Sequence, residues 1–503
     1  MAFASPAGHW LLAVAVLGSG MAFLDGTVVN VALPDIGRDF NASTSSLQWI
    51  LNGYLLTLAA LILLGGSLGD RYGRRRIFVL GTGLFTAASL LCAIAPTAEL
   101  LIGARLLQGI GGALLTPGSL AMIEASFRPA DRARAIGAWS GLGGVATAIG
   151  PLLGGYLIGA VSWRAIFLIN IPLGIIVMAL ATRHVPETRD PNASGHLDFI
   201  GASLAGLGLA GTTYALIEAP GKGASPLILL AGIGGVVALV AFLLSERRSA
   251  NSMMPLGMFA SRQFSAANLV TFVVYAALGG VFFLLVAFLQ ISLGYSPIEA
   301  GAASLPITVL MLLLSARSGA LAQRIGARIP LTIGPLVIAV GLLMMTRIDP
   351  GDSYVSSVLP AVIVFGLGLT LVVAPVTATV LAAADTQHAG IASGINNAVS
   401  RVAGLLAVAV LPLIAGLTGD NFYDPIKMTD GFHVAMISCA ALAAGGGILA
   451  WLTISSEVLE VEPATDGDTP DRAATDFSCA IAGTPLRPAR EARCALAQSA
   501  HQP

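Results

Sequence analysis

A single acidic residue stands inside an almost unbroken apolar stretch near the start of the chain. The stretch reads MAFLDGTVVNVALP, residues 21–34, and Asp25 is its only charged residue. An ionisable group within a membrane-type segment is costly and marks a functional site by default. A carboxyl that binds and releases a proton in a cavity could couple a proton gradient to transport, and when ionised it could attract a lipophilic cation. The alternative is a structural role, in which Asp25 only forms a hydrogen bond between helices.

A second ionisable group lies in the apolar stretch RLLQGIGGALLTPGS, residues 105–119. An arginine within a membrane normally faces the protein interior and is paired. We place Arg105 in the cytoplasmic third of the fourth span, with Gln108 one turn further on, and predict that Arg105 acts with Asp25 in proton coupling. The alternative, snorkelling to the membrane surface, suits Arg317 better because that residue lies nearer the end of its helix.

Aromatic and amide side chains within the apolar spans are candidates for substrate contact. Aromatic faces can contact a cation, and amides offer adaptable hydrogen bonds to a ligand. The candidates are Phe23, Tyr54, Asn268, Tyr275 and Asn396. Packing between helices or against lipid is the alternative for each of them. Arg401 follows Asn396 and Asn397, and it is either polar glue between helices or part of the cavity lining.

The composition is that of a membrane protein. Of 503 residues 56% are hydrophobic and 11% are charged, and the mean hydropathy is +0.84. A soluble protein could not keep so much apolar surface out of water. The net charge of −1 argues against a nucleic-acid partner. No Walker A lysine loop is present, which argues against an ATP-driven pump, and the four cysteines lack metal-ligand or disulfide spacing. We therefore expect no enzyme, no metal and no cofactor.

Apolar windows of about 20 residues, long enough to cross a bilayer core, recur along the chain. They predict about fourteen helices, all within residues 10–455. Their ranges are 10–33, 47–69, 76–96, 99–124, 134–160, 163–183, 197–217, 226–245, 264–292, 297–321, 329–347, 353–381, 389–418 and 431–455. The first window is too long for a signal peptide, so we expect it to be a retained span. The tail 456–503 is acidic and then rich in Pro and Ala, which predicts disorder.

The distribution of arginine predicts the orientation. Arg residues collect in alternate loops, beginning with the loop between the second and third spans, whereas the opposite loops hold few Arg or Lys residues. The Arg-rich side is expected to be cytoplasmic. An even number of spans then places both termini in the cytoplasm. We expect the membrane to be the inner membrane of a bacterium.

Two loops on the same predicted side repeat one pattern. Residues 66–81 read GSLGDRYGRRRIFVLG, and residues 319–334 read GALAQRIGARIPLTIG. Gly73 and Arg75 correspond to Gly326 and Arg328 at one constant offset. Repeated halves with a substrate site between them are typical of secondary transporters.

Each type of residue in the first copy of this loop has a physical role. Gly69 and Gly73 permit a tight reversal between two helices. Asp70 can accept charge-assisted hydrogen bonds from arginines or cap the next helix. The basic residues are Arg71, Arg74, Arg75 and Arg76, which also resist crossing the membrane.

The loop GSLGDRYGRRR resembles the cytoplasmic signature loop of the major facilitator superfamily. RLLQGIGGALLTPGS resembles the fourth-span motif of that family, and GLGGVATAIGPLLGG, residues 141–155, resembles the fifth-span motif of its antiporters. LDGTVVNVALP, residues 24–34, resembles the first-span motif of the fourteen-spanner drug:H⁺ antiporters. The second loop departs from the pattern, with Gln323 where Asp70 stands in the first.

The resemblance implies two six-helix bundles (1–190 and 251–455), two inserted helices (191–250) and a cytoplasmic tail (456–503). In the antiporter motif, Gly150, Pro151, Gly154 and Gly155 would prevent leak and favour exchange, and the signature loop would gate access. The implied function is proton-coupled efflux of lipophilic, cationic drugs by a monomer embedded in the lipid bilayer. A dedicated exporter of one metabolite or self-made antibiotic is the nearest alternative, and a non-transporting membrane sensor or scaffold is a more distant one.

Overall fold

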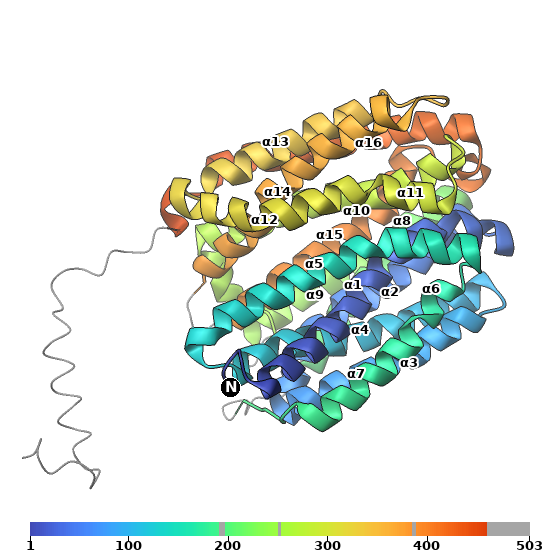
Figure 1. Ribbon diagram of the computed structural model, residues 1–503. Helices are drawn as coiled ribbons and strands as arrows, with labels where there is room; N and C mark the ends of the chain where they lie inside the picture. Colours follow the sequence, from blue (N-terminus) through green and yellow to red (C-terminus); the bar gives the residue numbers. More distant parts are fainter. Residues whose placement is uncertain (191–196, 250–252, 385–388, 460–503) are drawn as a thin grey trace, which may run out of the picture. The chain divides into compact units, whose positions relative to one another are not determined.

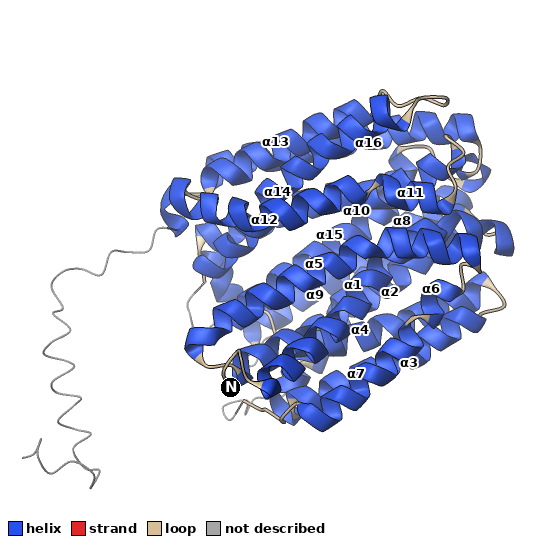
Figure 2. Cartoon of the chain, viewed as in Figure 1, coloured by secondary structure: helices blue, strands red, loops and turns tan. Residues whose placement is uncertain are grey.

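The computed structural model describes residues 1–190, 197–249, 253–384 and 389–459, and these residues form helices and no strands (Figure 2). The predicted tail therefore lies almost wholly outside the described residues. The α-helices are α1 (Pro6–Phe40), α2 (Thr44–Tyr72), α3 (Arg74–Ile94), α4 (Ala98–Ser126), α5 (Pro129–Ala160), α6 (Ala165–Leu168), α7 (Asn170–His184), α8 (Phe199–Lys222), α9 (Pro226–Arg248), α10 (Arg262–Ile291), α11 (Pro297–Ala303), α12 (Leu305–Ile325), α13 (Arg328–Met345), α14 (Leu359–Ala382), α15 (Ala389–Ile414) and α16 (Pro425–Thr453). Short single-turn helices cover Leu256–Ala260, Tyr354–Val358, Gly419–Phe422 and Ser456–Leu459.

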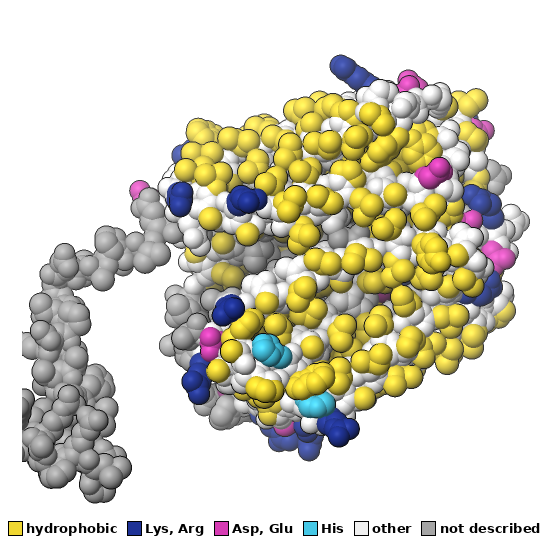
Figure 3. Space-filling view, viewed as in Figure 1, with side chains coloured by type: hydrophobic (Ala, Val, Ile, Leu, Met, Phe, Trp, Pro, Cys, Tyr) yellow, Lys and Arg dark blue, Asp and Glu magenta, His cyan; other side chains and the backbone are white. Residues whose placement is uncertain are grey.

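Within the described residues, fourteen segments are long and apolar enough to cross a membrane, which confirms the predicted number of spans. Three spans are each built from two helices. The sixth joins α6 to α7, the tenth joins α11 to α12 through Ser304, two residues before Pro306, and the twelfth joins the single turn Tyr354–Val358 to α14. Apolar side chains cover most of the visible face, and charged side chains gather toward its two ends (Figure 3).

The two repeated loops turn in the same way. Gly73, between α2 and α3, has φ of 113°, and Gly326, between α12 and α13, has φ of 83°. These positive φ values are costly for residues with a Cβ, which explains why both copies carry glycine at this position. The repeat seen in the sequence is therefore also a repeat of backbone conformation.

The first seven helices pack mainly against one another. α4 lies between α2 and α3, and α1 contacts α4, α5 and α7. Gly81 of α3 and Gly111 of α4 allow close approach, because a Cβ at Gly111 would lie 2.5 Å from the Phe85 amide nitrogen. We call α1–α7 the N-terminal half. In the C-terminal half, α10–α16, α13 packs against α14 and α16, and α10 against α15 and α16.

The helices α8 and α9 pack against each other as a hairpin. α8 also contacts α2 of the N-terminal half and α15 of the C-terminal half. The hairpin therefore lies beside the contact between α2 and α15. It coincides with the residues expected as an insertion.

α5 carries glycines against both halves, and Figure 1 shows it between α1 and the pair α11–α12. A Cβ at Gly150 would collide with Thr27 of α1, and one at Gly154 would collide with Val28. A Cβ at Gly155 would lie 2.6 Å from the Cα of Ile298 in α11. The glycines of the predicted antiporter motif therefore set the distance between α5, α1 and α11.

Across that same seam, Pro151 lies against Gly301 of α11, where a Cβ at Gly301 would lie 2.8 Å from the Pro151 carbonyl carbon. All four residues of the predicted antiporter motif thus lie at helix contacts.

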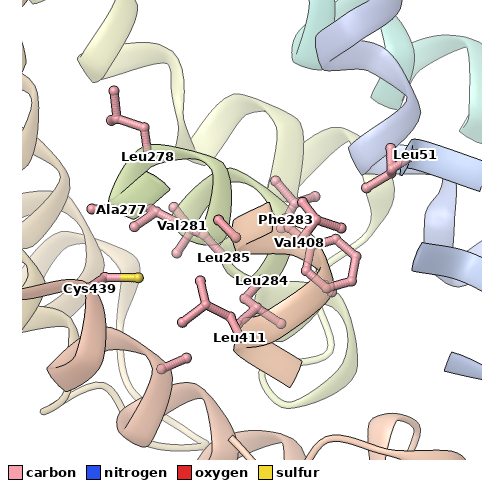
Figure 4. Close-up of a cluster of buried hydrophobic side chains, with 14 of the residues drawn as sticks. Leu51, Ala277, Leu278, Val281, Phe283, Leu284, Leu285, Val408, Leu411 and Cys439 are labelled. Carbon is pink, nitrogen blue, oxygen red and sulfur yellow. The ribbon is translucent and has the colours of Figure 1, made fainter. Parts of the chain in front are cut away.

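Side-chain hydrogen bonds between the halves gather where α1 ends and α2 begins. Gln48 donates to the Val408 carbonyl at 2.7 Å, and Thr44 donates to the Gly419 carbonyl at 2.9 Å. The Tyr423 hydroxyl donates to the Ala42 carbonyl at 2.9 Å. A buried apolar cluster adjoins this seam, with α10 residues Leu284 and Leu285, Leu411 of α15 and Cys439 of α16 in it (Figure 4).

At the opposite end, the side-chain hydrogen bonds of Arg75 and Arg328, one from each repeated loop, stay within one half. Arg75 donates to the Val185 carbonyl at 3.0 Å in the N-terminal half. Arg328 donates to the Trp451 carbonyl at 2.8 Å in the C-terminal half. The side-chain hydrogen bonds between the halves therefore gather at one end, whereas α2 and α15 also pack together further along, where Leu63 lies beside Gly394.

Replacing Gly155 by Val is expected to abolish most transport, because its branched side chain would force α5 away from α11. The control is Gly159→Val, one turn further along α5, where an added Cβ meets no atom within 4 Å. Efflux from cells with equal amounts of each protein in the membrane measures the effect. Equal efflux by the two variants would contradict the packing argument.

A buried ion pair as the candidate functional site

Asp25 and Arg105 come from different helices and meet inside the N-terminal half. Asp25 is the twentieth residue of α1, and Arg105 is the eighth residue of α4. The Arg105 Nη1 atom lies 2.5 Å from Asp25 Oδ2. The exposed fraction of the side chain is 1% for Arg105 and 0% for Asp25. Asp25 and Arg105, each predicted from the sequence as a functional ionisable residue, thus form one fully buried ion pair.

The predicted depth of Arg105 in its span was wrong. α4 begins at Ala98, at the end of the helices opposite the Gly69–Arg75 loop. Arg105 therefore lies toward the end away from that loop, at the level of Asp25. Alternation of helix direction puts the start of the fourth span on the non-cytoplasmic side whenever the loop is cytoplasmic.

Two amide side chains, Gln108 and Asn170, also donate hydrogen bonds to Asp25. Gln108 donates through Nε2 to Asp25 Oδ1 at 2.8 Å and to Ser89 Oγ at 2.9 Å. Its own Oε1 accepts from Arg105 Nη1 at 2.6 Å. Asn170 donates to Asp25 Oδ1 at 3.4 Å. Both carboxylate oxygens thus have partners, as a buried charge requires.

The guanidinium of Arg105 is held from its other side by aromatic rings and a carbonyl. Its Nε donates to the Ile50 carbonyl at 3.1 Å. Its central carbon lies 4.5 Å from the centre of the Tyr54 ring and 5.9 Å from that of Phe167. A lysine could not form these planar contacts together. The position therefore suits arginine specifically.

The structure corrects the expectation that Asp25 faces a cavity. Asp25 has no exposed surface in this conformation and is neutralised by Arg105. A cation could reach the carboxylate only after that pair opened. The arrangement instead makes each charge depend on the other, because loss of the Asp25 charge would remove the charge that compensates Arg105. Leaving one member of a buried pair uncompensated costs about 3–5 kcal/mol.

Ion pairs and hydrogen bonds hold the signature loop within the N-terminal half. Asp70 accepts from Arg74 at 2.7 Å, and Glu187 lies 3.6 Å from Arg75. The Asp190 amide donates to the Asp70 carbonyl at 3.1 Å. The loop therefore rests on the segment that follows α7. Arg71 lies over the Tyr72 ring at 5.6 Å, and Gly69 lies one turn before Gly73, whose amide it accepts at 3.0 Å.

The structure separates the five candidate substrate residues. Tyr54 is 1% exposed and packs on Arg105, and Asn268 is 4% exposed. Asn396 donates to Asn268 Oδ1 at 3.2 Å, so these two residues link α10 to α15. In this conformation Tyr54 and Asn268 have helix-packing roles. Phe23 and Tyr275 remain half-buried, and Phe23 lies beside Trp139 with ring centres 6.4 Å apart.

Sequence reasoning missed Ser89, Asn170 and Glu187. The first two are polar residues within predicted apolar spans, and that signal could have selected them as partners of a buried charge. Glu187 lies in a loop 112 residues beyond Arg75, and nothing local to either residue indicates their contact.

Comparison with known proteins decides the family. The model of the Major Facilitator Superfamily matches residues 15–408. The chain belongs to this superfamily. Membership makes it a multi-pass membrane transporter rather than an enzyme, as the sequence motifs predicted.

Relatives of this superfamily member include resistance proteins. It is 36% identical to the methylenomycin A resistance protein of Bacillus subtilis, over 90% of this chain and 96% of the relative. It is 35% identical to the puromycin resistance protein of Streptomyces alboniger, over 90% and 92%. It is 31% identical to the multidrug efflux pump LfrA of Mycolicibacterium smegmatis, over 95% and 93%.

Solved structures with the same fold are more distant in sequence. A bacterial homologue of the human drug peptide transporters PepT1 and PepT2 matches with a TM-score of 0.63 at 14% identity, covering 89% of this chain and 98% of the other. The human organic anion transporter MFSD10 matches with a TM-score of 0.58 at 17% identity, covering 89% and 100%. These likenesses support the major facilitator fold.

Arg105→Ala is expected to lower the free energy of unfolding by about 3–5 kcal/mol, because it leaves the Asp25 carboxylate buried without a cation. The double variant Asp25→Asn with Arg105→Gln should recover part of this loss, because it removes both charges together. Thermal unfolding of the detergent-solubilised protein, followed by tryptophan fluorescence, compares the two. A double variant as unstable as Arg105→Ala would show that the charges are not coupled.

Proposed function

We propose that this protein exports lipophilic antimicrobial compounds across the inner membrane of a bacterium in exchange for protons. The observation that carries this proposal is the fully buried Asp25–Arg105 pair, which lies within the membrane-spanning part of a Major Facilitator Superfamily member. Intramembrane carboxylates mark proton pathways in transporters. Relatives over nearly the whole chain are named as resistance proteins and efflux pumps.

The excess of arginine in the loop between α2 and α3 supports a cytoplasmic position for that end of the helices. Both termini would then lie in the cytoplasm. The hydrogen bonds that join the halves gather at the opposite end. On this orientation the conformation described here is closed toward the outside, and substrate would enter from the cytoplasmic side. The Gly69–Arg75 loop would gate that entrance.

The proton step follows from the geometry of the pair. A proton that reaches Asp25 from the outside would neutralise its carboxylate and weaken its contact with Arg105. The guanidinium would keep the Ile50 carbonyl, the Gln108 oxygen and the Tyr54 ring. Because α1 also carries the contacts of Gly150 and Gly154 with α5, a shift of α1 would reach the seam between the halves. Release of the proton on the cytoplasmic side would restore the pair.

The breadth of export is the second question. Some relatives are named for a single antibiotic, such as tetracenomycin C or puromycin, and others as multidrug resistance proteins. This observation favours a dedicated exporter as the second candidate function. Resistance to one compound only, in a panel of chemically diverse drugs tested on a pump-deficient host, would establish it.

Asp25→Asn is expected to abolish proton-driven efflux while preserving membrane insertion, because an amide cannot bind and release the coupling proton. Transport into everted membrane vesicles with an imposed pH gradient measures the effect. Asp35→Asn is the matched control, since Asp35 lies on the same helix and pairs with the exposed Arg38 at 3.0 Å. Wild-type export by Asp25→Asn under the same gradient would disprove proton coupling through this residue.

A further inference from the structure

Arg401 is a second arginine in the interior of the spans, and within the described part of the chain it has no carboxylate partner. It is the thirteenth residue of the 26-residue α15, so it lies halfway along a membrane-spanning helix. Its side chain is half-buried. Among the described residues no carboxylate oxygen lies within 4.0 Å of it, and its one hydrogen bond runs from Nε to Asn397 Oδ1 at 3.3 Å. Its two terminal nitrogens are therefore available to a ligand.

An arginine at this depth is rare unless it is paired or lines a hydrated cavity that a substrate crosses. Asp25 cannot be the missing partner in this conformation, because both of its oxygens are bound to Arg105, Gln108 and Asn170. Asp25 and Arg105 cancel each other's charge. Arg401 thus contributes an uncompensated positive charge between the halves.

Arg401 lies on α15, which packs against α2 of the N-terminal half and α10 of the C-terminal half. Its guanidinium is close enough to Tyr54 of α2 and Tyr275 of α10 to interact electrostatically with both hydroxyls. A Cβ on Gly404, one turn along α15, would meet no atom within 4 Å, although the backbone of Gly404 itself packs against Gly279 of α10. The side-chain oxygen of Asn397 accepts from Nε, and no hydrogen bond of the terminal nitrogens is present among the described residues.

A guanidinium with free terminal nitrogens recognises an anionic oxygen by two parallel charge-assisted hydrogen bonds. We propose that Arg401 binds an acidic oxygen of the exported compound, either a carboxylate or an ionised phenol or enol. The inference rests on the proposed export function and specifies the substrate class. It differs from the expectation of a purely cationic substrate, because the charge left uncompensated inside the protein is positive.

The test uses two dyes that differ only at the acidic group, rhodamine B with its free carboxylate and the methyl ester of rhodamine B. Their efflux is measured in proteoliposomes that contain the full chain under an imposed pH gradient. Arg401→Gln is expected to raise the KM for the carboxylate dye about ten-fold or more, and to leave the KM for the ester unchanged. Arg401→Lys should give an intermediate value, because it keeps the charge and loses the planar fork.

Arg317→Gln is the matched control, since it removes an exposed arginine from the membrane-spanning α12, where its contact is the Leu313 carbonyl. It should behave as the wild type with both dyes. Export of the ester by Arg401→Gln reports that the variant is folded. An equal loss of both dyes in that variant, or an unchanged KM for the carboxylate dye, would overturn the inference.

Wild-type export of the ester without the carboxylate dye would also overturn the inference and would leave the proposed function intact. If the wild type exports neither dye nor any compound of the drug panel, the proposed function itself fails.

Discussion

The structure depends on the need to keep two opposite charges neutral inside an apolar bundle. A carboxylate and a guanidinium each lose their hydration in this position, and only mutual contact and further hydrogen bonds offset that loss. Four helices contribute to the offset. α1 carries Asp25, α4 carries Arg105 and Gln108, α3 carries Ser89, and α7 carries Asn170. The pair therefore fixes how these helices are arranged around it, and any change of its charge state acts on all of them.

Close backbone contact is the second constraint, because it lets the effect of the pair reach the other half. Helices in a membrane gain little from hiding apolar side chains from one another, so they rely on small residues for close packing. α5 applies this rule on two faces: Gly150 and Gly154 lie against α1, and Gly155 lies against α11. Because these glycine contacts leave no gap between the helices, even a movement of α1 by a fraction of an ångström would displace α5. The antiporter motif is, in physical terms, a rigid contact between the helix of Asp25 and the C-terminal half.

The fold and the two charges could be predicted from the sequence because their signals are local. Fourteen apolar windows define fourteen spans. An acid or arginine inside such a window can be recognised from the sequence before its partner is known. The partner relations could not be predicted in the same way. Glu187 contacts Arg75 only because α7 returns to the signature loop, and Ser89 and Asn170 become important only because of where α3 and α7 place them. The depth of Arg105 could have been predicted from the alternation of helix direction, and its misplacement came from ignoring that direction.

Tyr54 gives the two interior arginines a common neighbour. Its ring lies under the guanidinium of Arg105, and its hydroxyl interacts electrostatically with Arg401 across the seam between α2 and α15. Tyr54, first considered as a substrate contact, is thus buried against the ion pair and lies within electrostatic reach of Arg401. A ligand held at Arg401 and a proton held at Asp25 would each change the field at this one side chain. On this proposal Tyr54 couples the two events, because it senses the charge that each event would alter.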